Sequence, residues 1–140
     1  MVEIELKPDT RRPNKFMIEE NEQGVPHFHW RATLHSHIWR PPTDVLETEE
    51  AILVRVEIAG MQNANFSVTL DERNLVIRGV RPDQVDRRAF HQMEIRFGEF
   101  VTEVELHWVI NTQFIEAEYK DGFLWVTLPK AQPYSVKIES

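Results

Sequence analysis

The most concentrated set of side chains capable of chemistry is a group of four histidines in the N-terminal third of the chain. His27, His29, His35 and His37 form two His-x-His pairs, and in an extended segment this spacing places both rings of a pair on the same side. A zinc or nickel site needs three or four converging ligands, and residues 27–39 contain no carboxylate or cysteine to complete one. We therefore expect no bound metal. The alternative is a pH-sensitive segment whose charge rises as the rings are protonated near about pH 6 to 6.5.

Enzyme and nucleotide motifs are absent from the sequence. Ser36 lies between two histidines, but no nucleophile elbow surrounds it, which disfavours a hydrolase. The chain has no cysteine, and so neither a disulfide framework nor a thiolate nucleophile. Its glycines are all isolated, so no loop is built to hold the phosphates of a nucleotide: Gly24, Gly60, Gly79, Gly98 and Gly122. We predict a protein that is not an enzyme and uses no cofactor or nucleotide.

Charge and length narrow the class further. A net charge of −7 without a basic run argues against binding to nucleic acid or to an anionic membrane surface. No run approaches the roughly 18 apolar residues of a membrane span, and the first residues contain no apolar segment of a signal peptide. We expect a cytoplasmic protein. Its 140 residues, 41% of them hydrophobic, suit one compact domain with extensions.

The elements that would position functional side chains are β-strands. From Trp39 onward apolar and polar residues alternate, as in Ile52, Val54, Val56 and Ile58, and this period of two indicates strands with one buried face. We predict strands at 43–47, 52–58, 66–70, 75–78, 90–97, 100–106, 115–119 and 123–128, with Gly60 and Gly79 ending two of them and a loop at 81–89. Short strands with regular turn signals predict an all-β, antiparallel, immunoglobulin-like sandwich.

Three regions follow from this pattern. Residues 1–38 are polar, interrupted by prolines and dotted with small apolar clusters, so we predict a flexible N-terminal arm. Residues 39–130 form the sandwich domain. Residues 131–140 are a short C-terminal tail in which Val136 and Ile138 alternate with polar neighbours.

The last predicted hairpin also carries a family resemblance. Asp121-Gly122 supplies the positive φ angles of a tight turn, and the stretch from Ala117 through Gly122-Phe123-Leu124 to Leu128-Pro129-Lys130 resembles the A-x-x-x-(N/D)-G-x-L signature and Leu-Pro-Lys ending of the α-crystallin domain of small heat-shock proteins. Further segments are similar in the right order: 39–48, Ile58-Ala59-Gly60, the Phe90-His91 to Phe100 region, and Val136-Lys137-Ile138. The resemblance covers residues 39–130.

The sequence departs from the family pattern in two places. Thr102, Glu103 and Glu105 stand where the family carries arginines, and His107-Trp108 replaces its Leu-Pro. Ion pairs between subunits are therefore not carried over. Loop 81–89 is short for the strand-exchanging loop of bacterial, archaeal and plant members, so we make no prediction of oligomer size or of strand exchange.

The resemblance implies an ATP-independent chaperone, a holdase that binds unfolding client proteins through apolar surfaces under stress, and that self-associates into a dimer and larger oligomers. It also implies roles for particular residues. These are a C-terminal anchor (Val136, Ile138), an anchor-accepting groove (Val68, Leu70, Ile115, Ala117), dimer contacts (Thr43, Val45, Arg81, Val85, Phe90) and a client-binding arm (Phe16, Phe28, Trp30, Trp39).

Simpler interpretations stay open for each of these surfaces. The tail is alternatively a frayed end or a strand that folds onto its own domain, and the aromatic residues of the arm alternatively pack over the sandwich. The alternative for the whole protein is a p23-like co-chaperone or adaptor, a sandwich that binds a folded partner.

Overall fold

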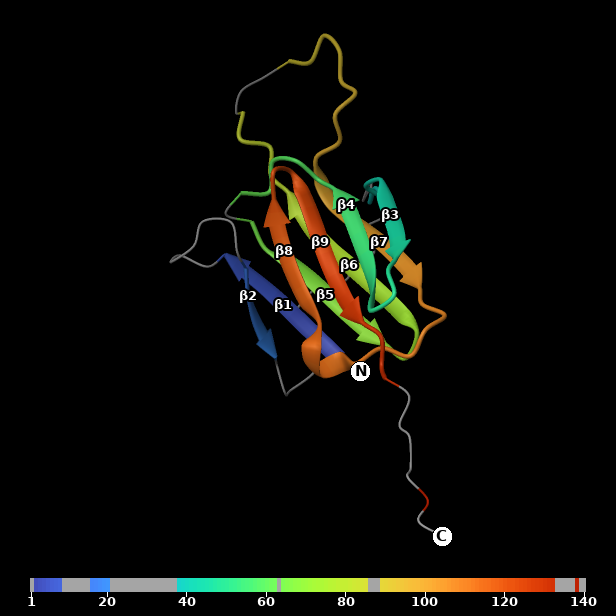
Figure 1. Cartoon of the computed structure of the whole chain (residues 1–140). Coiled ribbons are helices and arrows are strands. Elements are labelled where there is room, and N and C mark those ends of the chain that lie inside the picture. The colour runs from blue at the N-terminus through green and yellow to red at the C-terminus, as the bar shows by residue number, and fades with distance from the viewer. Residues whose placement is uncertain are drawn as a thin grey trace.

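The chain folds into two antiparallel β-sheets packed face to face (Figure 1). The computed structural model describes residues 2–8, 16–20, 38–62, 64–85, 89–132 and 138. Sheet A has the order β2-β1-β5-β6-β7 and sheet B the order β3-β4-β9-β8. The elements are β1 (Val2–Pro8), β2 (Phe16–Glu20), β3 (Thr43–Glu47), β4 (Ala51–Glu57), β5 (Phe66–Asp71), β6 (Asn74–Arg81), β7 (Gly98–Glu105), the 3-10 helix η1 (Thr112–Phe114), β8 (Glu116–Lys120) and β9 (Phe123–Pro129). The predicted all-β sandwich is confirmed.

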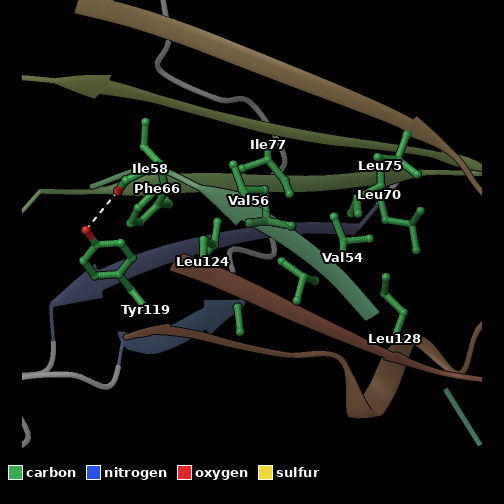
Figure 2. Packing of buried hydrophobic residues seen from close by; sticks show 14 of the residues in the cluster. Val54, Val56, Ile58, Phe66, Leu70, Leu75, Ile77, Tyr119, Leu124 and Leu128 are labelled. Carbon is green, nitrogen blue, oxygen red and sulfur yellow. Dashed lines mark hydrogen bonds between the residues drawn. The ribbon is translucent and has the colours of Figure 1, made fainter. Parts of the chain in front are cut away.

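The core lies between the sheets and follows the alternation in the sequence. In β4, Ile52, Val54 and Val56 are completely buried while their neighbours in the strand are not. They belong to the same core cluster as Leu75 and Ile77 of β6 in the opposite sheet, and Figure 2 shows Val54 and Val56 in the core with these two residues. Full burial of such an aliphatic side chain contributes roughly 1.5–3 kcal/mol relative to exposure, so the alternating strands supply most of the driving force for closing the sandwich.

The predicted hairpins are present, with one error in a strand end. Asp121 and Gly122 have φ angles of 51° and 84°, as a tight hairpin turn between β8 and β9 requires. We expected Gly79 to end its strand, which is wrong, because β6 continues to Arg81 and pairs Gly79 with Phe100. A Cβ at Gly79 would lie 2.5 Å from the Phe100 ring, so this glycine serves close packing and not a turn.

The strand predicted at 90–97 is also wrong. The described residues 89–97 contain no strand, and together with 82–85 they belong to one connection between β6 and β7, which we call the β6–β7 loop (residues 82–97). Apolar alternation forms a strand only where a neighbouring backbone is available for hydrogen bonding, and β6 pairs directly with β7 instead. The loop is therefore longer than the expected 81–89. In Figure 1 it extends beyond the end of the sandwich.

Two strands lie inside the region that we expected to be an arm outside the sandwich. β1 pairs antiparallel with β5, and β2 pairs with the other side of β1. The signal was present in the sequence, because Val2, Ile4 and Leu6 alternate with glutamates. The segment does not appear among the strands predicted from the sequence, because it was considered only for a signal peptide. The prediction of an arm without sandwich elements is thus wrong for Val2–Pro8 and Phe16–Glu20.

Candidate interaction surfaces

The predicted anchor groove lies between β5 of sheet A and β8 of sheet B. Its four predicted residues all belong to the hydrophobic core between the sheets, with Val68 and Leu70 from β5, Ala117 from β8 and Ile115 just before β8, and their role as a groove stays a prediction. All four are buried, between 1% and 7% exposed. The groove is therefore not an open surface in this chain. β1 runs along the β5 edge and β2 contacts β8 (Figure 1).

The predicted C-terminal anchor is described only in part. Val136 lies outside the described residues, whereas Ile138 is described and is 88% exposed. The tail leaves the sandwich where the backbone N–H of Ala131 donates to the carbonyl oxygen of Val109 at 2.8 Å. An aliphatic side chain this exposed has apolar surface available for binding elsewhere.

Among the described strands, β3 is an edge strand of sheet B. β3 pairs only with β4 among the described strands, and Val45 and Leu46 are 44% and 36% exposed. Thr43, at the start of β3, is fixed to the opposite sheet because its Oγ1 lies 2.8 Å from Oγ1 of the buried Thr102. Asp44 forms an ion pair with Arg55 of β4. The edge is rigidly held and partly apolar, which suits strand addition.

An ion pair supports the far end of the same edge. Lys130 Nζ lies 3.0 Å from Glu47 Oε1 and donates to the carbonyl oxygen of Thr48 at 2.8 Å. The hydrogen bond from Lys130 holds the pKa of the Glu47 carboxyl below its ordinary value, with a smaller contribution from Trp108. The contact connects the end of β3 to the residue that follows β9.

Arg81 fixes the base of the β6–β7 loop. Its Nε donates to the carbonyl oxygen of Arg96 at 2.8 Å, and its guanidinium lies over the rings of Trp39 and Phe97 at 4.5 Å and 5.2 Å. Partial burial lowers the pKa of Arg81, although arginine remains charged at neutral pH. The structure places this predicted dimer contact within one chain. A role between subunits stays a prediction.

Beyond this base the loop exposes a series of large apolar side chains. Val85, Phe90, Met93 and Ile95 are 50–64% exposed. Val85 and Phe90 are predicted dimer contacts, and that role stays a prediction. Met93 and Ile95, exposed in the same loop, are not among the predicted contacts. Their signal was the alternation that we assigned to a strand of this chain. An apolar stretch of this kind on the surface is typical of a binding segment.

The four residues of the predicted client-binding arm have three different outcomes in the structure. Phe28 and Trp30 lie outside the described residues, as do His27, His29, His35 and His37, and Phe16 is described only as part of the backbone of β2. Trp39 is 8% exposed and packs on Phe100, with ring centroids 5.8 Å apart. The assignment of Trp39 to an exposed arm is therefore wrong. Its ring closes one end of the core because its backbone joins the edge of β7.

The described part of the chain adds two negative observations. It holds no group of three or more histidine, cysteine, aspartate or glutamate side chains placed to bind a metal ion. None of its helices is long and apolar enough to cross a membrane.

Comparisons with known proteins agree with this geometry. Residues 44–139 match the model of the Hsp20/alpha crystallin family. The chain is 28% identical over 94 residues to Small heat shock protein C2 of Rickettsia felis, covering 66% of this chain and 61% of that protein. It is 30% identical over 102 residues to the Probable 15 kDa heat shock protein of Leptospira interrogans, covering 73% and 78%.

The fold is similar to that of a solved relative as well. HSP18.5 from E. histolytica superimposes with a TM-score of 0.60 at 26% identity, over 73% of this chain and 99% of that one. The family model spans more than half of the residues, including both strands of the hairpin that carries the sequence signature. The chain belongs to the Hsp20/alpha crystallin family.

Proposed function

We propose that this protein is an ATP-independent holdase, a chaperone that binds unfolding proteins through exposed apolar surfaces and prevents their aggregation. Family membership supports a chaperone role and carries the proposal. The exposed apolar side chains of the β6–β7 loop and of β3 support the mode of binding, since they offer contacts to any partly unfolded chain.

The same surfaces suit self-association into a dimer. The edge of β3 that no described strand pairs could accept an extended segment through backbone hydrogen bonds, and the β6–β7 loop has the alternation of such a segment at Met93 and Ile95. We propose that the loop of one copy pairs with β3 of another. Exposed Val45 on one copy and Val85 and Phe90 on the other are the predicted contacts that this arrangement would bury.

Larger assemblies would form through the C-terminal anchor. Burying Val136 and Ile138 in the groove of another copy stabilises by roughly 1.5–3 kcal/mol each. Ordering the tail costs about 1–2 kcal/mol per residue in backbone entropy. The two contributions nearly cancel, so a single anchor exchanges readily and assembly depends on many weak contacts acting together.

The chaperone activity is tested by light scattering from a heat-denaturing model client with no nucleotide present. Near-stoichiometric amounts of this protein should suppress scattering, relative to an inert protein at equal mass. If scattering is unchanged at temperatures where this protein remains folded, the holdase proposal is refuted and an adaptor that binds a folded partner becomes the better explanation.

The dimer is tested separately with a substitution on the β3 edge. Val45→Lys places a charge where the loop of the partner would pair, and should lower the mean mass measured by light scattering. Val109→Lys is the matched control, because Val109 is 78% exposed and lies outside β3 and the β6–β7 loop. Equal masses for the two variants would contradict pairing through β3.

A further inference from the structure

The edge of β5 is already occupied by the chain's own first strand. β1 pairs antiparallel with β5 from Val2 opposite Leu70 to Leu6 opposite Phe66, and β6 pairs with the other side of β5. Both sides of β5 are therefore used within one chain (Figure 1). A strand offers one row of hydrogen-bonding groups to each side, so a second segment cannot pair on the side that β1 covers.

The segment that covers this edge has the pattern of the C-terminal anchor. Val2-Glu3-Ile4 and Val136-Lys137-Ile138 are both Val-x-Ile, with two β-branched residues separated by one charged residue. In the register of the sheet, Val2 lies opposite Leu70 and Ile4 opposite Val68. These partners are the two β5 residues predicted to line the anchor groove, and the side chain of Val2 packs against the core cluster.

We propose that β1 is an internal occupant of the anchor groove, and that it competes with the C-terminal Val-x-Ile segment for the β5 edge. This inference rests on the anchor assigned under the proposed function. It makes the availability of the groove a property of the N-terminal segment: the groove is closed while β1 is paired, and accepts the tail of another copy when β1 leaves.

One buried polar atom of β1 opposes its docking on the sandwich. Glu3 is only 5% exposed, and its buried Oε2 atom has no hydrogen-bond partner in the described part of the chain. Burying a polar oxygen without a partner opposes docking. Within the described residues, β1 pairs with β5 on one side and with β2 on the other, and β2 in turn contacts β8. The apolar contact of Val2 favours the docking of β1 on β5, and the carboxylate of Glu3 opposes it. A substitution at Val2 should therefore weaken docking, and one at Glu3 should strengthen it.

The experiment compares Val2→Asp, which should release β1, with Glu3→Val, which should hold it more firmly. Both are made in the full-length chain carrying Val136→Ser and Ile138→Ser, so that its own anchor cannot occupy the groove. The probe is a fluorescent peptide of residues 131–140, blocked at both ends, whose Lys137 and Glu139 give a net charge of zero. A peptide with serine at both anchor positions is the control. Hydrogen exchange of the amides of residues 66–70 reports independently on whether β1 is paired.

Apparent affinity falls by the fraction of molecules in the binding-competent state, so a groove that is open about 1–10% of the time binds roughly 10–100-fold more weakly than one that is always open. We expect Val2→Asp to bind the peptide at least about tenfold more tightly than the parent chain, with faster exchange at residues 66–70. Glu3→Val should bind more weakly, with slower exchange.

Different results overturn different steps. Equal exchange at 66–70 in the parent and Val2→Asp chains would show that β1 does not cover β5. Faster exchange with unchanged peptide affinity would refute the competition. A peptide that binds no variant, even where exchange shows β5 released, would refute both the anchor of the proposed function and the competition for it. Should Val2→Asp fail to fold, Glu3→Val still decides, because it must weaken peptide binding and slow exchange.

Discussion

Replacing Gly79 with alanine gives a sharp test of the close packing between β6 and β7 on the core face of sheet A. A Cβ at this position would lie 2.5 Å from Cζ and 2.9 Å from Cε1 of Phe100, well inside the roughly 3.5–4.0 Å of a favourable carbon contact. The ring cannot move freely, because Phe100 is 1% exposed and packs between Trp39 and Phe66, with centroids 5.8 Å and 6.2 Å away.

The sign of the change in the free energy of unfolding shows whether the added Cβ of Gly79→Ala clashes with the Phe100 ring. Without a clash, Gly79→Ala should stabilise by about 0.4–1 kcal/mol, because alanine reduces the entropy of the unfolded chain. Overpacking a closed core costs about 1–3 kcal/mol. We therefore expect a net loss of about 1–2 kcal/mol in the free energy of unfolding, measured by urea denaturation with tryptophan fluorescence at several protein concentrations.

Two further variants isolate the steric cause. In a Phe100→Leu background, Gly79→Ala should cost less, with a coupling of at least about 0.5 kcal/mol between the two sites. Gly98→Ala is the control, since its φ of +91° makes alanine strained although no atom lies within 4 Å of the added Cβ, and Phe100→Leu should not relieve it. A Gly79→Ala protein as stable as the parent chain would refute the close approach of β6 and Phe100.

Three other contacts give predictions of their own. The hydroxyl of Tyr119 donates to the carbonyl oxygen of Ile58 at 2.9 Å (Figure 2) and accepts from the backbone N–H of Met61 at 3.2 Å. Tyr119→Phe removes both hydrogen bonds, so it should lower the free energy of unfolding by about 1–3 kcal/mol in urea denaturation; an unchanged value would contradict this. Arg81→Met should speed hydrogen exchange at residues 95–97 with little change in the core, because it removes the donor at the base of the loop; equal exchange would show that the loop is fixed by other contacts. The lowered pKa of Glu47 means that its pairing with Lys130 stabilises the fold above the ordinary carboxyl pKa, and that this contribution is lost as pH falls through the lowered value. The midpoint temperature of thermal unfolding should therefore fall less steeply from neutral to acidic pH in Lys130→Met than in the parent chain. Parallel profiles would contradict the pairing of Glu47 with Lys130 as the cause of the lowered pKa.

Local patterns in the sequence were sufficient to predict the fold class, the family resemblance and most strands of the sandwich. Alternation in Ile52, Val54 and Val56 sufficed because a period of two leaves one face for burial wherever the strand pairs. The Asp121-Gly122 turn sufficed because few dipeptides adopt two positive φ angles. These features are local, so neighbouring residues contain the whole signal.

The groove residues are predicted through the family resemblance, and in the structure all four belong to the hydrophobic core: Val68, Leu70, Ile115 and Ala117. What the sequence did not reveal is that this cluster is buried in the chain and that β1 covers the β5 edge. Pairing between residues about 60 positions apart depends on which strand edge is free. No local pattern encodes that.

Contacts between distant parts of the chain determine the conformation of segments whose local pattern is ambiguous. The alternation at 90–97 is that of a strand. These residues nevertheless form a loop, because β6 and β7 pair with one another through their backbone hydrogen bonds. Gly79 has the residue type that often ends a strand, yet it lies within β6, where the absence of a Cβ leaves room for the Phe100 ring. Trp39 looks like part of an arm, yet it closes the core. In each case the residue type limits the possibilities, and the nearest backbone or ring from a distant part of the chain selects one of them.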